Sequence, residues 1–323
     1  MITYLVTGSD GHLGNTVMSD LVSQGRKVRG LRLPNSPLLS PVLGEVCYGD
    51  VTDKDSLDAF FSVDEAIVIH TAGLISVSSR MDKKLYAVNV LGTRNIIDKC
   101  KEYKVRKLLY VSSVHAFPVL DTMITETKDF DPDKVDGPYA KTKAMASKEV
   151  LAASDDLYVN LVHPSGILGP GDYGHGHLTG VIREYLSHKL TTCVHGGYDI
   201  VDVRDVAKGI LAVLDKGRAG ENYILSGTYH EISDLLALAS EYSGHPPIKT
   251  FIPLWLAKTM APLAELYYKL RNKPALYSLY ALATLSSKSY FSCAKAENEV
   301  GYTHRSLEET VRDTLTFMKS QNP

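Results

Sequence analysis

The sequence predicts an α/β fold with a doubly wound parallel sheet whose two faces are covered by helices. Short apolar runs alternate with amphipathic stretches through the N-terminal half, and the first run enters a glycine-rich turn. Strand–helix alternation at this interval is typical of βαβ units, whose strands are parallel. We expect strands at Thr3–Val6, Lys27–Leu31, Ala66–His70, Lys107–Val111, Leu157–His163 and Asn222–Leu225, and helices at Leu13–Ser23 and Ala87–Lys101.

Composition argues against several classes of partner. The 323 residues carry a formal net charge of −2, which gives no reason to expect nucleic acid or an anionic membrane surface. The four cysteines are scattered without a Cys-x-x-Cys pair, and His175 and His177 have no carboxylate or thiolate cluster near them, so no metal site is expected. No leader-like segment precedes the first strand, which makes the cytoplasm the expected location. No apolar run approaches the ~18–20 residues that span a bilayer.

A glycine turn follows the first strand and opens the first helix. Gly8, Gly11 and Gly14 are spaced as Gly-x-x-Gly-x-x-Gly. Such glycines let the backbone approach a pyrophosphate, and the helix N-terminus supplies N–H donors and positive potential. At the start of a βαβ series this turn predicts a dinucleotide site, against the alternative of a purely structural turn. The residues expected to bind the dinucleotide here are Gly8, Asp10, Gly11, His12, Leu13 and Gly14.

The end of the second strand predicts which dinucleotide is preferred. An acidic residue about 20 residues past the turn normally holds the adenosine ribose 2′-hydroxyl. Arg32 stands there instead, and a guanidinium suits a 2′-phosphate. NADP(H) is therefore the expected cofactor and NAD(H) the alternative, unless Arg32 is only a solvated strand-end residue. Asp50 and Val51, after the third strand, are expected to meet the adenine.

Taken together, the motifs resemble the extended short-chain dehydrogenase/reductase family, part of the NAD-dependent epimerase/dehydratase superfamily, along nearly the whole chain. The sequence is most similar to the dihydroflavonol-reductase and 3β-hydroxysteroid-dehydrogenase-like branch, although His163 stands where that branch usually has Arg before Pro164. The matching stretches are Thr7–Gly14, Asp50-Val51, Ile69–Gly73, Asn89–Thr93, Tyr110–Ser113, Tyr139–Lys143, His163-Pro164 with Gly169-Pro170, and Val201–Val206.

The resemblance implies a Rossmann-type domain and a smaller, mainly helical C-terminal substrate domain. We place the dinucleotide-binding domain at residues 1–165 and the substrate-binding domain at 166–323, with segments around 200–226 returning to the first. The resemblance also implies cofactor contacts at Thr71, Ala72, Gly73, Tyr139, Lys143 and Pro164, and a catalytic group of Ser113, Tyr139 and Lys143.

The catalytic group has a physical basis in its spacing. Tyr139 and Lys143 are four residues apart, so on a helix they share a face, and Asp136 precedes them as the expected helix cap. A nearby ammonium lowers a tyrosine pKa from ~10 towards the working pH, so Tyr139 can exchange a proton with the substrate oxygen. Ser113 ends a strand and can hydrogen-bond that oxygen. The resemblance implies that Asn89 helps to relay protons or holds a helix kink, and the alternative is a buried asparagine with a purely structural role.

The spacing Tyr-x-x-x-Lys occurs three times, and its position in the fold decides between the copies. Only Tyr139/Lys143 follows a strand-end serine and falls on the helix before the next strand. The other two copies are Tyr103/Lys107, which runs into a strand, and Tyr185/Lys189, which lies in the region assigned to substrate.

Residues 251–290, rich in Leu, Ala and Tyr, follow the last strand of the sheet. Apolar residues there recur at helical spacings of three and four, which predicts helices with one apolar stripe. We expect this stripe to line or close the substrate pocket and the Gly-rich loop 169–180 to move over it. The alternatives are that the stripe fills the core, joins two copies of the chain in a homodimer, or lies on a membrane surface. The stripe consists of Trp255, Leu256, Met260, Leu263 and Tyr267.

These observations predict an NADPH-preferring oxidoreductase that reduces a carbonyl, or oxidises the matching alcohol, on a bulky and largely apolar small molecule. The first alternative is a nucleotide-sugar epimerase or dehydratase with retained NAD. Such relatives usually carry Arg just before the Val-Asp-Val-type motif, where this chain has Asp199. The second alternative is a non-catalytic NADP-sensing regulator. Such relatives often lose the Tyr or the Lys, and this chain keeps both.

Overall fold

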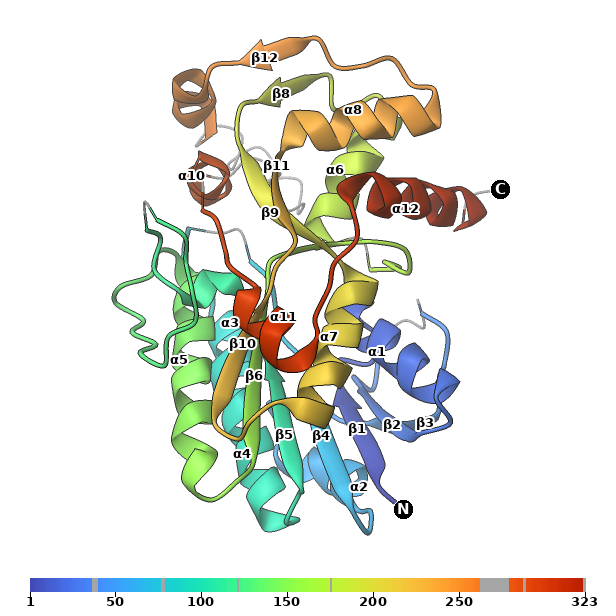
Figure 1. Cartoon of the computed structure of the whole chain (residues 1–323), viewed down its shortest axis with the longest axis vertical. Helices are drawn as coiled ribbons and strands as arrows, with labels where there is room; N and C mark the ends of the chain where they lie inside the picture. Colours follow the sequence, from blue (N-terminus) through green and yellow to red (C-terminus); the bar gives the residue numbers. More distant parts are fainter. Residues whose placement is uncertain are drawn as a thin grey trace.

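The structure is a computed structural model, and it describes residues 1–36, 40–76, 79–120, 122–174, 176–261, 279–286 and 289–321. Figure 1 shows a large sheet with its helices in the lower part and a smaller group of strands and helices above it. None of the helices within the described ranges has both the length and the apolar character needed to cross a membrane.

A seven-stranded sheet forms the lower part and confirms the predicted fold class (Figure 1). The strand order is β10-β6-β5-β4-β1-β2-β3, so the chain winds outwards from β1 in both directions. All neighbouring pairs are parallel, and all five residues of β1 are buried, as expected where helices cover both faces. The strands are β1 (Thr3–Thr7), β2 (Lys27–Arg32), β3 (Glu45–Tyr48), β4 (Ala66–His70), β5 (Lys107–Val111), β6 (Val159–Pro164) and β10 (Glu221–Leu225).

Two helix layers bury the two faces of this sheet. Successive side chains of a strand point to opposite faces, so Tyr4 and Val6 of β1 enter one apolar core and Leu5 enters the other. The first layer consists of α1 (His12–Ser23) and α7 (Val203–Lys216), and the second includes α2 (Asp58–Phe61), α4 (Gly92–Glu102) and α5 (Pro138–Ala152). Short 3₁₀ turns lie at Asp55–Leu57, Val114–Ala116 and Ala153–Asp155.

The helix predicted at residues 87–101 begins differently in the structure. A short α3 (Lys83–Tyr86) leads into a π-helical turn, Ala87–Leu91, and α4 starts only at Gly92. A π turn interrupts the regular i→i+4 ladder, so apolar periodicity alone does not locate it. The turn contains the buried Asn89, whose amide bonds outside the helix.

The upper part packs around a third apolar core. One small sheet has the order β11-β9-β7, and β8 pairs with β12. These strands are short and pair with distant segments, so local periodicity did not predict them. The domain boundary at residue 165 stays a prediction. The elements are β7 (Gly166–Leu168), α6 (His177–Leu186), β8 (Thr192–Val194), β9 (Gly197–Asp202), β11 (Thr228–Glu231), α8 (Ile232–Ser243), β12 (Thr250–Ile252), α10 (Leu279–Ser286) and α12 (Leu307–Gln321). Between α10 and α12 the chain returns to the large sheet, where α11 (Ala294–Val300) packs in the same core as α1 and α7.

The apolar stripe predicted near the C-terminus does not pack as expected where the structure describes it. Trp255 is 67% exposed and Met260 is 56% exposed. Their helix instead contacts the third core through Leu254, Ala257 and Ala261. These three residues show the same spacing of three and four, so the sequence indicated the helical period but not the buried face. The stripe residues Leu263 and Tyr267 lie outside the described residues.

An ion-pair network joins the large sheet to the upper part. Asp202 caps α7 by accepting the Arg204 backbone N–H at 2.9 Å, and its carboxylate pairs with the Arg204 guanidinium at 2.7 Å. Arg204 also pairs with Asp313 of α12 at 2.8 Å, and Arg305 pairs with Asp205 at 2.7 Å. Burial raises the pKa of Asp202, but hydrogen bonds and charges from the two arginines outweigh burial and hold that pKa below its usual value.

Replacing Arg305 by Ala should lower the free energy of unfolding by about 3 kcal/mol, because the buried carboxylates of Asp202 and Asp205 lose a partner. Urea unfolding followed by circular dichroism measures this. The loss should shrink as the pH falls through the lowered pKa of Asp202. A carboxyl group whose pKa is lowered by folding stabilises the fold fully at pH values above its unfolded pKa, and this stabilisation is lost as the pH falls through its folded pKa.

The matched control is Arg106→Ala, because Arg106 is 55% exposed and pairs with Glu65 at 3.6 Å on the surface, away from the network. We expect this change to alter stability by less than about 0.5 kcal/mol. Equal effects of the two substitutions would show that the network contributes no more to the free energy of unfolding than a surface ion pair does.

Candidate active site

A cleft opens at the carboxyl ends of the central strands, where doubly wound folds bind ligands. It encloses about 1480 Å³, counting the space at its open mouth, and both the large sheet and the upper part contribute to its walls. The predicted site residues that line it are Gly8, Gly11, His12, Leu13, Gly14, Thr71, Gly73, Ser113, Tyr139, Lys143 and Pro164. The predicted residues that do not line it are Asp10, Arg32, Asp50, Val51 and Ala72.

The glycine turn lies against the end of β4. Gly8 has φ +64°, and a Cβ there would lie 2.9 Å from the Ala72 backbone. A Cβ on Gly14 would lie 2.1 Å from the Gly8 carbonyl oxygen. Only glycine fits at both positions. Gly11 is the N-cap of α1 and no side chain caps this end, so the N–H groups of the first turn are available to a ligand in the cleft.

A buried histidine supports the turn from behind. Thr93 Oγ1 donates its proton to the Asn89 carbonyl at 2.7 Å, so it accepts from His70 Nε2–H at 3.1 Å. His70 Nδ1 then accepts the Thr7 hydroxyl proton at 2.7 Å. Burial lowers the pKa of His70 to about 3, which keeps the ring neutral. This role was not predicted from the sequence. The feature that could have indicated it is a histidine at the end of the otherwise apolar strand β4.

Asn89 connects the loop after β4 to helix α5. Its Oδ1 accepts the Leu74 N–H at 2.8 Å, and its Nδ2 donates to the Leu74 carbonyl at 3.0 Å and to Thr142 Oγ1 at 3.1 Å. Thr142 Oγ1 in turn donates to the Tyr139 carbonyl at 2.8 Å. The Asn89 amide is thus occupied at both ends, which favours the structural interpretation over a proton relay.

Ser113, Tyr139 and Lys143 come together in the wall of the cleft, and all three are buried. Tyr139 and Lys143 lie one turn apart on α5, and Ser113 follows β5. Lys143 Nζ donates to the Val111 carbonyl at 2.9 Å and contacts the Tyr110 hydroxyl at 3.3 Å. No carboxylate within the described ranges pairs with it. Burial therefore lowers the pKa of Lys143 to about 7.

Helix α5 begins with Pro138 in its first turn, but Asp136 is not its cap, contrary to the sequence prediction. Gly137 occupies the N-cap with φ +88°, and no side chain caps this end. The left-handed backbone at Gly137 favours glycine, so the glycine rather than the aspartate sets the helix start. Asp136 borders a pocket instead.

Arg32 is 4% exposed, so the interpretation of a solvated strand-end residue is wrong. Its Nη2 donates to Ser40 Oγ and to the Pro41 carbonyl, both at 3.2 Å. Its Nε and Nη1 have no hydrogen-bond partner among the described residues. Buried guanidinium nitrogen atoms without partners are costly unless a ligand completes their hydrogen bonds.

The remaining predicted cofactor residues have local partners. Asp10 accepts the Ser36 hydroxyl proton at 2.9 Å. Asp50 Oδ1 accepts from the backbone N–H and the hydroxyl of Thr52, both at 2.8 Å. Val51 is buried beneath the start of α4, where a Cβ on Gly92 would lie 2.7 Å from it. Their contacts with an adenine stay a prediction.

His163, the residue in place of the usual arginine, supports Ser113. Its Nδ1 lies 3.2 Å from the Ser113 carbonyl oxygen, so Nδ1 carries the donated proton. The ring stacks on Phe130 with centroids 5.3 Å apart and packs against Phe117 at 4.6 Å. Burial lowers the pKa of His163 to about 3, so a neutral imidazole holds the backbone of Ser113, the predicted catalytic serine.

The other two Tyr-x-x-x-Lys copies lie away from the cleft. Tyr103 hydroxyl donates to Asp58 Oδ1 at 3.1 Å, and Tyr185 hydroxyl contacts the carbonyls of His245 and Pro246 at 3.2 and 3.0 Å. Neither tyrosine lines the cleft.

Two further observations concern metal ligands. His177 lines the cleft, and His175 lies outside the described residues. Elsewhere, ligand atoms of Cys293, Glu297 and His304 lie within 4.8 Å of one another, a grouping that the sequence analysis did not predict. Burial raises the pKa of Cys293 to about 11, so its thiol is protonated at neutral pH.

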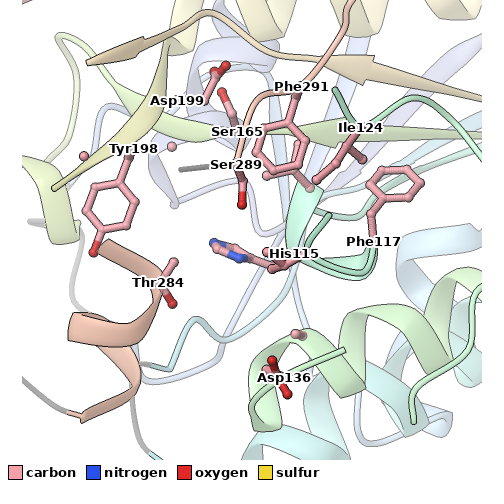
Figure 2. Close-up of a pocket in the computed structure, with 15 residues that line it drawn as sticks. His115, Phe117, Ile124, Asp136, Ser165, Tyr198, Asp199, Thr284, Ser289 and Phe291 are labelled. Atoms are coloured by element: carbon pink, nitrogen blue, oxygen red, sulfur yellow. The ribbon is translucent and has the colours of Figure 1, made fainter. Parts of the chain in front are cut away.

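A second pocket of about 910 Å³ adjoins the cleft and shares His115, Ser165, Tyr198 and Thr284 with it. Figure 2 shows the His115 ring pointing into this pocket. Burial lowers the pKa of His115 to about 4, so the ring is neutral at neutral pH. Thr284 and Ser289 of the 251–290 range line the pocket, whereas the exposed Trp255 does not. The apolar residues of its wall are Val114, Phe117, Val119, Ile124, Ala140 and Phe291.

Comparison with known proteins agrees with this geometry. The chain is 29% identical to "Sterol demethylase protein B" of Methylococcus capsulatus over 99% of both chains. It is 27% identical to "Putative dihydroflavonol 4-reductase" of Synechocystis over 98% of this chain and 94% of the relative. The crystal structure of gox2253 superposes with a TM-score of 0.85 at 28% identity, covering 99% of this chain and 98% of that chain.

The family assignment follows from a match over more than half of the chain. Residues 4–226 match the model of the NAD dependent epimerase/dehydratase family. This range contains the glycine turn, the Ser113–Tyr139–Lys143 group and the strands of the large sheet, apart from the first residue of β1. The chain therefore belongs to the NAD dependent epimerase/dehydratase family and is an NAD(P)-dependent oxidoreductase.

Proposed function

We propose that the chain uses NADPH in preference to NADH to reduce a carbonyl, or NADP⁺ to oxidise the matching alcohol, on a bulky and largely apolar small molecule. The observation that carries this proposal is the position of Ser113, Tyr139 and Lys143 in the cleft wall, beside a pocket with apolar walls. Relatives named as a dihydroflavonol reductase, a 3β-hydroxysteroid dehydrogenase and a 2-alkyl-3-oxoalkanoate reductase support a substrate of this kind.

The described residues fit an NADP-type dinucleotide. At Gly8 and Gly14 the backbone packs too closely for any side chain, so bare backbone faces the cleft there. The uncapped start of α1 offers N–H donors to a pyrophosphate. Arg32 offers two unpartnered guanidinium nitrogen atoms to a 2′-phosphate. When bound, the dinucleotide supplies the hydride for the substrate carbonyl carbon.

The catalytic group supplies the proton and stabilises charge. Tyr139 donates its phenolic proton to the substrate oxygen as negative charge develops there, and takes it back in the oxidative direction. Ser113 Oγ accepts the backbone N–H of His115 at 3.3 Å, so the Ser113 hydroxyl proton is available to the substrate oxygen. Lys143, with a pKa of about 7, becomes fully charged when a phenolate forms beside it, since each charge stabilises the other.

The two alternative functions have less support. A nucleotide sugar carries a diphosphate, which needs a cationic side chain to bind it. The second pocket is lined by Asp199 instead, and none of the described residues that line this pocket is Lys or Arg. The epimerase structures that resemble this chain, such as that of PA4631 at 21% identity, show the fold alone. A non-catalytic sensor has no need of the complete Ser–Tyr–Lys group.

The charge of Arg32 should set cofactor preference. Arg32→Asp should shift the ratio of catalytic efficiencies towards NAD(H) by tenfold or more, about 1.4 kcal/mol, because the 2′-phosphate loses its cation. Steady-state kinetics with both cofactors measure the ratio. Arg32→Gln should shift it in the same direction by a smaller amount, and an unchanged ratio in both variants would refute the NADP assignment.

Removing the Tyr139 hydroxyl should abolish most turnover. Tyr139→Phe should lower kcat by roughly 10²–10⁴-fold while cofactor affinity barely changes, because the phenol acts on the substrate. NADPH oxidation with a panel of flavonoid, steroid and small aromatic carbonyls provides the assay. Tyr103→Phe and Tyr185→Phe are matched controls that should retain turnover. A larger loss in either control than in Tyr139→Phe would contradict the assignment.

The buried Lys143 should lower the free energy of unfolding, although the proposed reaction requires it. Its pKa is about 7 in the fold and ~10.4 in the unfolded chain, so the penalty is complete below pH 7 and vanishes as the pH rises towards ~10.4. Lys143→Met should therefore raise the free energy of unfolding by about 2 kcal/mol at pH 6 and by less at pH 9, while turnover is lost. Urea unfolding at both pH values tests this. A stability loss at pH 6 would contradict it.

A further inference from the structure

A buried carboxylate lies in the inner wall of the substrate pocket. Asp199 of β9 is 6% exposed, and its Oδ1 accepts the Gly227 N–H at 2.8 Å. No described residue hydrogen-bonds its second oxygen, Oδ2. Burial raises the pKa of Asp199, and the nearby Ser165 hydroxyl and Gly227 N–H offset part of that rise. One carboxylate oxygen is therefore committed to the fold and the other is available to the pocket that Asp199 lines.

Ser165 lies beside this carboxylate and lines both the cleft and the pocket (Figure 2). It is 8% exposed, and its Oγ has no hydrogen-bond partner in the part of the chain that the structure describes. The hydroxyl is near enough to Asp199 to lower its pKa but does not meet the geometry of a hydrogen bond. A buried hydroxyl without a partner is uncommon in folded proteins and indicates that another group completes its hydrogen bonding.

The residues that line the pocket around this pair are unsuited to an anion, although His304 and His230 lie near enough to Asp199 to lower its pKa. None of the pocket's described lining residues is Lys or Arg, and the burial that lowers the pKa of His115 to about 4 leaves its ring neutral. The remaining carboxylate, Asp136, lies at an exposed position of the same pocket. A carboxylate or phosphate brought next to Asp199 would meet like charge in a low-dielectric site.

We propose that Ser165 and Asp199 bind a neutral hydroxyl group of the substrate and exclude substrates that carry an anionic group at this position. This inference rests on the proposed function, because it assigns the substrate class of the same pocket. A substrate hydroxyl can donate to Asp199 Oδ2 while it accepts from the Ser165 hydroxyl, so both buried groups gain a partner. A carboxylate has no proton to donate and repels Asp199.

The test is the binding of a matched set of ketones to the full-length protein with NADP⁺, a complex in which no hydride can pass to the ketone. The probes are 4-phenylbutan-2-one and its ring-substituted forms that carry a hydroxyl or a carboxylate at the meta or para position. Titration calorimetry gives each Kd. We expect the better hydroxyl isomer to bind about tenfold more tightly than the parent ketone and about 100-fold more tightly than the carboxylates.

Three variants assign the selectivity to residues. Asp199→Asn keeps an oxygen for the Gly227 N–H and should reduce the hydroxyl-to-carboxylate ratio by about tenfold. Ser165→Ala should weaken the binding of the hydroxyl ketone and leave the Kd of the parent ketone unchanged. Asp136→Asn is the matched control, and it should change the ratio by less than about threefold because solvent screens its exposed carboxylate.

The outcomes separate this inference from the proposed function. Carboxylates that bind as tightly as the hydroxyl ketones, an unchanged ratio in a folded Asp199→Asn, or no binding of any probe would overturn the inference. If the predicted selectivity is found in binding but NADPH reduces none of the bound ketones, the inference stands and the proposed reductase function fails.

Discussion

A chain of buried hydrogen bonds runs from the glycine turn, which is the proposed cofactor turn, to α5, which is the proposed catalytic helix, and the geometry of the cleft depends on it. It passes through Thr7, His70, Thr93, Asn89 and Thr142 and ends on the backbone of α5. Each of these five side chains is at most 1% exposed. Because a buried polar group that loses its partner costs about 1–3 kcal/mol, the chain fixes the cofactor turn and the catalytic helix relative to each other.

The cleft and the strand end that carries Arg32 contain groups that the described residues leave without full hydrogen bonding. Lys143 is buried with a carbonyl and a phenol in place of a carboxylate, Arg32 has two unpartnered nitrogen atoms, and Ser165 has an unpartnered hydroxyl. These groups lower the stability of the fold by the desolvation cost of each. A dinucleotide and a substrate can supply the missing partners, so the same groups that weaken the fold provide differential binding. The close-packed cores on either side of the sheet offset the cost.

The sequence predicted the parts of this protein that depend on local pattern. Six of the seven strands of the large sheet and the glycine turn follow from apolar periodicity and from the backbone freedom of glycine, whereas the edge strand β3 has no fully buried residue and was given no range. The start of α4 did not, since a π turn precedes it, and the helix of Trp255 buries the neighbouring face through Ala257 and Ala261. The contact between His163 and the Ser113 carbonyl joins residues 50 positions apart, so no local pattern could have indicated it.

The two halves of the site differ in how they are built, and this difference explains why reaction type is easier to infer than substrate. Most cofactor-side residues lie in short motifs at the ends of consecutive parallel strands, where the topology itself brings them together. The proposed substrate pocket instead draws on segments as distant as His115, Ser165, Asp199 and Ser289, which come from different parts of the chain. A single substitution in any of these segments changes the pocket without touching the hydrogen-bond chain behind the cofactor turn. Relatives 27–29% identical over nearly the whole chain can therefore share the hydride chemistry while their names specify different substrates. Substrate class must then be argued from individual pocket residues and their charges, as the pair Ser165 and Asp199 allows.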